Sequence, residues 1–277
     1  MYKTRAERSN YSRHIFVVFS VVALWVFAWP LFAGSGLVEA GVAITLSLVT
    51  IPVIVVVLSL MADSSLRSVN TLALVGVLAG VAALARVLST GFGGFELVFV
   101  VVILAGRALG ARPGFVVGVL AIALSSLVWG GFGPWTPYQM IALGWVGLGA
   151  GLIPTPWGRQ FGARSRREVL MLAAYGVVAS YLFGLLMNLW FWPVAVGPET
   201  SISLDSGASS GENLASFLLY SLATSTLTWD TVRAITTVVT LLVVGGAALR
   251  ALRRVYSRDD LDRKVLGLGV VENKSIR

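Results

Sequence analysis

The sequence predicts an all-α protein, a polytopic membrane bundle of about eight transmembrane helices with both termini in the cytoplasm. Three observations predict it. Of the 277 residues, 57% are hydrophobic and 12% are charged, whereas about 25% of residues are charged in ordinary soluble domains. The apolar residues form runs of roughly 17 to 25, which is the length of a membrane-spanning helix. Lys and Arg lie in alternate connections between these runs, as the positive-inside rule predicts.

The apolar runs divide the chain into four parts. The predicted spans, alternately outward and inward, are 14–32, 42–61, 71–88, 95–109, 114–129, 138–152, 169–192 and 231–249. A further apolar stretch, 214–227, is too short to cross comfortably, so we expect a partial helix at the outer surface. The expected order of the parts is a cytoplasmic tail (1–13), a transmembrane hairpin (14–61), a six-helix core (70–250) and a charged cytoplasmic tail (251–277).

The net charge of +8 reports orientation rather than a nucleic-acid partner, because its position follows the membrane topology. The expected outer connections instead carry Glu39, Glu199, Asp205 and Glu212. Catalytic chemistry also has little support. The chain has no Cys, its only histidine is His14 at the cytoplasmic edge of the first span, and no phosphate-binding loop or zinc motif is present. We therefore expect no metal, no cofactor and no enzymatic activity.

Polar side chains within apolar helices are the first functional candidates, because placing a polar group in the hydrocarbon of a bilayer costs free energy. Arg86 and Arg233 are the two basic residues outside the cytoplasmic connections, and Asp230 lies near the same outer depth. We expect an outward-facing pocket there, which an interfacial aromatic belt and ion pairs (Arg86 with Glu96, Arg233 with Asp230) would explain in part. The expected lining is Arg86, Glu96, Trp135, Tyr138, Gln139, Asn188, Trp190 and Trp192.

Two local patterns add detail. Thr136, Pro137 and Gln139 have the spacing of a capping box, which predicts that the sixth span begins with Thr136 as its N-cap. Small residues recur at helical spacing in the third span, where they allow close helix approach within the bundle or docking to another membrane subunit. These small residues are Gly76, Ala79, Gly80 and Ala83.

Four segments carry a resemblance to a known family: 78–88 (LAGVAALARVL), 99–118 (FVVVILAGRALGARPGFVVG), 133–140 (GPWTPYQM) and 188–193 (NLWFWP). From 71 to 249 the chain resembles the substrate-binding S components of energy-coupling factor (ECF) transporters. The resemblance implies a six-helix protein of the bacterial cytoplasmic membrane. Such a protein captures a micronutrient from outside and docks to a coupling transmembrane subunit driven by two ATPase subunits.

The resemblance also implies roles for particular residues. Ala79 and Ala83 look like the family's docking motif, and the Gly-rich turn after Leu88 looks like its gating loop. The N-terminal hairpin departs from the six-helix plan. Among vitamins, thiamine or its pyrimidine precursor, riboflavin and queuosine-type bases stay open, and the resemblance favours cobalamin. Two alternatives from other classes are an ion-coupled transporter using Glu96 or Asp230, and a membrane-embedded enzyme using the same carboxylates.

Overall fold

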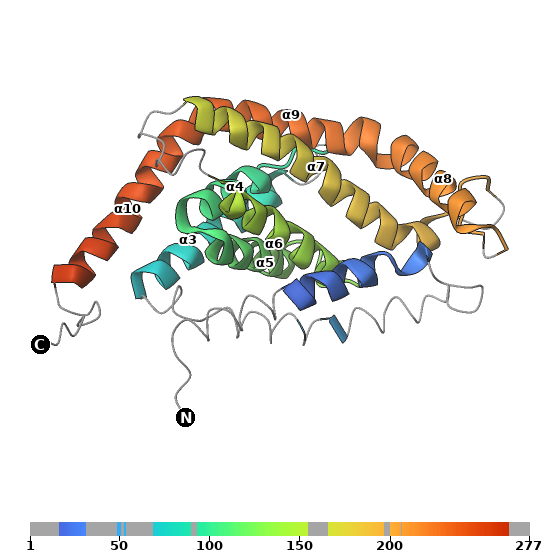
Figure 1. The fold of residues 1–277 in the computed structure, drawn as a ribbon, viewed down its shortest axis with the longest axis horizontal. Helices are drawn as coiled ribbons and strands as arrows, with labels where there is room; N and C mark the ends of the chain where they lie inside the picture. The colour runs from blue at the N-terminus through green and yellow to red at the C-terminus, as the bar shows by residue number, and fades with distance from the viewer. Residues whose placement is uncertain are drawn as a thin grey trace, which may run out of the picture.

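The computed structural model describes residues 17–31, 49–50, 53, 69–89, 93–154, 166–196, 200–205 and 207–265. Within these ranges the secondary structure is helical (Figure 1). The helices are Val17–Phe27, the 3-10 turn η1 (Trp29–Leu31), α3 (Val69–Ser89), α4 (Val98–Leu109), α5 (Ala111–Val128), α6 (Thr136–Leu152), α7 (Arg166–Ala195), α8 (Ser210–Ser221), η3 (Leu222–Asp230), α9 (Thr231–Thr240), η4 (Leu241–Gly245) and α10 (Gly246–Val265).

The chain is a polytopic membrane protein. Four described helices are long and apolar enough to cross a bilayer: Val69–Ser89, Ala111–Val128, Arg166–Ala195 and Ser210–Tyr256. Val17–Phe27 and Val98–Leu109 are shorter apolar helices. Most of the second predicted span, 42–61, and both chain ends lie outside the described residues.

The last helix differs from the prediction. We expected a partial helix at 214–227 and a separate span from 231, but α8, η3, α9, η4 and α10 follow one another directly. The helix Ser210–Tyr256 has 47 residues, a length of about 70 Å against a hydrocarbon core of about 30 Å. The helix is therefore longer than one crossing requires, and the single crossing expected from the sequence stays a prediction. The segments η3 and η4 are π-helix; η3 (LATSTLTWD) carries polar side chains, whereas η4 (LLVVG) is apolar.

The core is formed by α4, α5 and α6, which pack closely because glycines meet at their contacts. A Cβ added at Gly106 or Gly114 would run into the backbone of Gly147 on α6. In Figure 1, α7 and the long last helix lie side by side above these core helices. This layer of two helices covers the core and forms one wall of the cavity described below.

The N-terminal helix Val17–Phe27 packs against α5 and α6 through aromatic rings. Phe19 meets Phe115 edge-on at 6.4 Å between centroids, and Phe27 meets Tyr138 at 5.1 Å. The indole of Trp145 donates to the hydroxyl of Ser20 at 3.2 Å. The helix is therefore attached to the core by specific contacts as well as by hydrophobicity.

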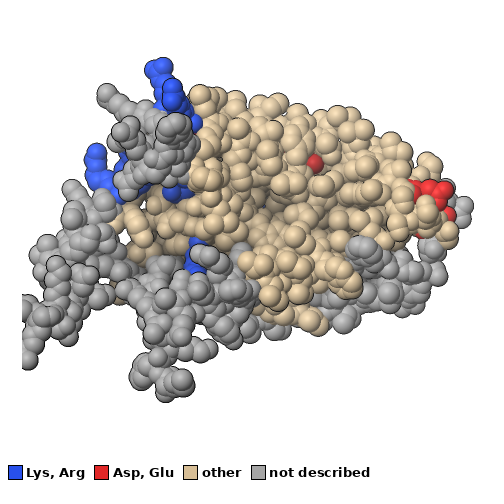
Figure 2. Space-filling view, in the orientation of Figure 1, with Lys and Arg blue, Asp and Glu red and all other residues tan. Residues whose placement is uncertain are grey.

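The charges separate along the molecule. Figure 2 shows Lys and Arg gathered at one end, where α10 lies in Figure 1, and most of the visible Asp and Glu gathered at the opposite end, beside α8. The end at α8 carries Asp205 and Glu212. The positive-inside rule predicts that the α8 end faces outward, and this end is called the outer end below.

Candidate ligand-binding site

A cavity of about 310 Å³ lies between the start of α6, helix α7 and the last helix. The turn before α4, the start of α6, the outer half of α7 and the last helix supply its walls. The lining residues are Glu96, Gln139, Phe183, Gly184, Met187, Asn188, Tyr220, Thr224, Ser225, Trp229, Asp230 and Arg233. The lining thus combines aromatic rings with hydroxyl, amide and charged groups.

Arg233 is the centre of an ion network at the base of this cavity. Its guanidinium donates to both oxygens of Glu96, at 3.1 and 3.3 Å, and to Asp230 at 2.6 Å. The rings of Phe99 and Phe183 lie 5.3 and 5.1 Å from the guanidinium carbon, within cation–π range. The expected pair of Arg233 with Asp230 is confirmed. The network holds the turn before α4 against the last helix.

The π-helix η3 carries part of the lining, and its side chains bond at the spacing of that helix. Ser225 donates to Asp230 at 2.8 Å, and Thr231 donates to the carbonyl of Thr226 at 2.8 Å. The hydroxyls of Ser221 and Thr226 lie 3.2 Å apart. All three contacts join residues five apart, the repeat that a π-helix brings together and an α-helix does not. The hydroxyls therefore stabilise the wide turns that present Asp230 to Arg233.

Two glycines permit close approach to η3. Gly94 has a φ of +90°, which favours glycine, and a Cβ there would strike the backbone of Trp229. A Cβ at Gly184 on α7 would overlap the carboxylate of Asp230. The turn before α4 and the middle of α7 therefore both pack directly against η3.

The two amide side chains of the cavity are held from behind. Arg86 on α3 donates to the oxygen of Gln139 at 3.0 Å and to the hydroxyl of Ser125 at 2.9 Å. The amide nitrogen of Asn188 lies 2.8 Å from the hydroxyl of Ser221. The predicted capping box at the start of α6, with Thr136 as the N-cap and Gln139 as its reciprocal partner, is wrong. Helix α6 includes Thr136, whose hydroxyl accepts from the amide of Gly133, and the Gln139 side chain turns to Arg86.

Only some of the side chains expected at the pocket line the cavity. Glu96, Gln139 and Asn188 line the cavity, and Arg86 lies behind Gln139. Trp135 is 42% exposed, and neither it nor the remaining aromatic residues, Tyr138, Trp190 and Trp192, line the cavity.

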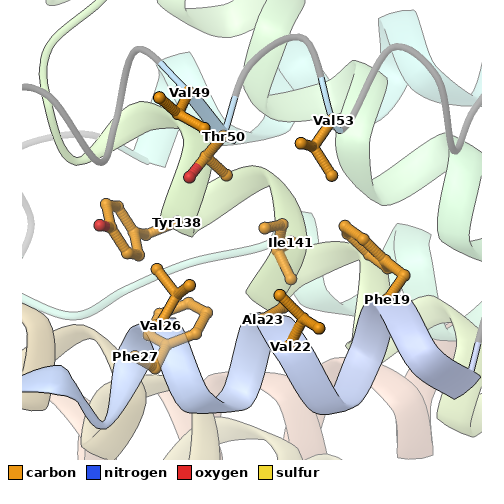
Figure 3. A pocket seen from close by; sticks show the side chains of 10 residues that line it. All are labelled: Phe19, Val22, Ala23, Val26, Phe27, Val49, Thr50, Val53, Tyr138 and Ile141. Carbon is orange, nitrogen blue, oxygen red and sulfur yellow. The ribbon is translucent and has the colours of Figure 1, made fainter.

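Three of these aromatic residues have structural contacts. Tyr138 is buried and faces a separate apolar pocket of about 110 Å³ against the N-terminal helix (Figure 3). Trp190 is buried and packs on Tyr138 at 4.9 Å between ring centroids. Trp192 is buried, packs on Phe217, and donates to the carbonyl of Ile202 at 2.7 Å.

The expected docking residues also differ in exposure. Ala79 and Ala83 are buried, at 0% and 7% exposure. Gly76 and Gly80 lie on the exposed face of α3, with nothing within 4 Å of an added Cβ. The small residues of α3 therefore serve two faces of the helix.

The sequence did not single out five of the lining residues, namely Phe183, Met187, Tyr220, Thr224 and Ser225. It did place the ion pair of Asp230 and Arg233 at the expected pocket, where the structure has it. One feature of the sequence indicates the lining residues of the last helix. The stretch LATSTLTWD (Leu222–Asp230) concentrates hydroxyls and a carboxylate within an otherwise apolar helix. In the described part of the chain, no group of three or more His, Cys, Asp or Glu side chains gathers as a metal site would require.

A helical membrane bundle with a polar cavity of ligand size between its helices is typical of membrane proteins that bind small molecules. Comparison with known families agrees. A family model described as the substrate-specific component of the ECF transporter matches residues 70–245, more than half of the chain. The chain therefore belongs to the ECF transporter substrate-specific components, which are transport proteins. No curated protein and no solved structure matches it.

Proposed function

We propose that this chain captures a vitamin or vitamin precursor from outside a bacterial cell at the cavity around Arg233. A coupling transmembrane subunit and two ATPase subunits then drive its import across the cytoplasmic membrane. The observation that carries the proposal is the cavity itself, in the outer part of a chain of this family and lined by Glu96, Gln139, Asn188 and Arg233.

The size of the cavity favours a small vitamin over cobalamin. About 310 Å³ lies at the lower end of the range of roughly 300 to 1,000 Å³ that encloses drug-sized ligands. A corrin ring with its nucleotide loop is several times larger than a single-ring vitamin. Trp229 and Tyr220 also supply the aromatic surfaces on which a planar ring of modest size stacks.

The ion network argues against the ion-coupled alternative. A proton site needs a carboxylate that gains and loses its proton during transport, whereas Glu96 and Asp230 are both bound to Arg233. Protonating either carboxylate would remove a partner from a guanidinium that is 6% exposed. The same pairing disfavours the carboxylates as the acid and base of a membrane enzyme.

The binding claim is tested by purifying the full chain in mild detergent and identifying co-purified small molecules by mass spectrometry. We expect one vitamin-like compound at close to one molecule per chain. Met187→Trp, which fills the cavity from α7, should abolish its retention. The matched control is Leu182→Trp, because Leu182 is 53% exposed on another face of the same helix. Equal retention by both variants would contradict the proposal.

Docking to the coupling subunit is proposed for the exposed face of α3 that contains Gly76 and Gly80. Gly80→Leu should reduce ATP-dependent uptake in cells carrying the coupling and ATPase subunits at least tenfold, while ligand binding by the isolated chain stays unchanged. Val243→Leu is the control, because Val243 is exposed on the last helix. Unchanged uptake by Gly80→Leu would refute this docking face.

A further inference from the structure

The charged groups at the cavity are engaged with one another or with neighbouring polar groups. Glu96 and Asp230 bind Arg233, and Arg86 donates to Gln139 and Ser125 behind the cavity wall. A charged ligand would therefore leave water for a site whose charged groups already have hydrogen-bonded partners in the protein. That transfer costs free energy unless a pair already present is broken.

Arg86 determines which group of the Gln139 amide faces the cavity. A guanidinium only donates hydrogen bonds, so the atom of Gln139 that lies 3.0 Å from Arg86 is the carbonyl oxygen. The NH₂ group has no other hydrogen bond to the described residues, and the side chain lines the cavity. Gln139 therefore offers the ligand a donor.

Asn188 supplies the complementary group from α7. Its nitrogen lies 2.8 Å from the hydroxyl of Ser221, which also contacts Thr226. This orientation leaves the carbonyl oxygen of Asn188 without a partner in the described part of the chain, at the wall of the cavity. Two neutral amides on different helices thus present one donor and one acceptor.

Aromatic side chains complete the recognition surface. Trp229 lines the cavity, and its side chain is 48% exposed. Phe183 and Tyr220 line the same space. Planar rings bind such surfaces by stacking, and this interaction needs no charge.

We propose that the ligand is an uncharged planar heterocycle whose edge accepts a hydrogen bond from Gln139 and donates one to Asn188. Lactam, imide and aminopyrimidine rings have such an edge. The inference rests on the proposed function and narrows its substrate class. It also assigns Arg86 as a positioning residue, which orients the Gln139 amide without touching the ligand.

The test uses four probes with the full chain in lipid nanodiscs, measured by isothermal titration calorimetry. Riboflavin and the hydroxymethyl aminopyrimidine precursor of thiamine are uncharged. Thiamine carries the same aminopyrimidine with a permanent positive charge, and biotin carries a carboxylate. We expect an uncharged probe to bind tightest, and the pyrimidine precursor to bind at least tenfold tighter than thiamine.

The outcomes separate the two claims. If thiamine or biotin binds tightest, or if the co-purified compound is charged, the substrate class is overturned while the proposed function stands. If no probe binds and no small molecule co-purifies, the proposed function itself fails.

A variant tests the donor directly. Gln139→Glu replaces the free NH₂ by a second acceptor and should weaken the tightest uncharged probe at least tenfold. Arg86→Met should weaken the same probe by a smaller factor, because Gln139 then loses its fixed orientation while staying in place. Met140→Leu, the next residue of α6, is the control and should stay within twofold of the wild type. Wild-type affinity in Gln139→Glu would overturn the assignment.

Discussion

The two ends of the bundle contain ion networks of opposite composition. At the outer end, one guanidinium, Arg233, binds two carboxylates, Glu96 and Asp230. At the opposite end, one carboxylate, Glu168, binds two guanidinium groups, Arg107 at 2.7 Å and Arg253 at 2.6 Å. Each network joins the region of α4 to the last helix, and each includes a contact with α7.

Their surroundings differ. All three members of the outer network line the 310 Å³ cavity, and the Glu96 side chain is 29% exposed. In the inner network Arg107 and Glu168 are 5% and 3% exposed, and neither lines that cavity. The inner network therefore holds three helices together, whereas the outer network also builds the wall of a binding site. Mutations at the two ends should accordingly separate stability from binding.

The largest loss of stability is expected from Glu168→Ala. The substitution leaves the buried guanidinium of Arg107 without its carboxylate, and breaking a buried pair in this way costs about 3–5 kcal/mol. Thermal unfolding in detergent should show the loss. Ligand affinity of the folded fraction should stay within twofold of the wild type. A large change in affinity would show that the Glu168 network also affects ligand binding.

Arg233→Ala should affect both properties. It removes the partner of Asp230, which is 1% exposed, and should reduce stability by about 3 kcal/mol. Because the turn before α4 is then released from the last helix, ligand affinity should fall at least tenfold. Arg233→Lys should retain part of both, since it keeps the charge but not the bidentate geometry. Retention of wild-type affinity in Arg233→Ala would mean that the network is purely structural.

Ser225→Ala should have a smaller effect. It removes one hydrogen bond to Asp230, worth about 1 kcal/mol of stability, so the unfolding temperature should fall slightly. Ligand affinity should fall by less than in Arg233→Ala, because Asp230 keeps its bond to Arg233. Thr228→Ala is the control, because the Thr228 hydroxyl is exposed and makes only a 3.4 Å contact within its own turn. Equal effects of the two substitutions would argue against a specific role of Ser225 in presenting Asp230.

Much of the fold followed from the sequence because lipid imposes few solutions. The apolar runs located the helices, and the distribution of Lys and Arg assigned the outer end. The spacing of three between Asp230 and Arg233 predicted their pairing. The contact of Arg233 with Glu96 joins residues 137 positions apart. Helical periodicity cannot indicate such a contact, because it depends on how the helices pack.

Two features of the site could not be derived from α-helical rules. The π-helix η3 changes the repeat from which faces are counted, so the contributions of Thr224 and Ser225 were not selected. The continuous last helix was missed because the residues 228–230 interrupt the apolar run, so that 214–227 alone is too short to cross a bilayer. Helical periodicity within α7 separates two of the expected lining residues. Asn188 and Trp190 are two residues apart and so point in different directions on a helix, which agrees with one lining the cavity and the other packing in the core.

If this transport protein holds its cargo in the cavity around Arg233, a structure of the full chain with its co-purified compound should show it there. Cryo-electron microscopy with a bound antibody fragment provides the measurement. We expect ligand density between α6, α7 and η3, in contact with Gln139, Asn188 and Trp229. Density at another position, with this cavity empty, would show that the cargo binds elsewhere.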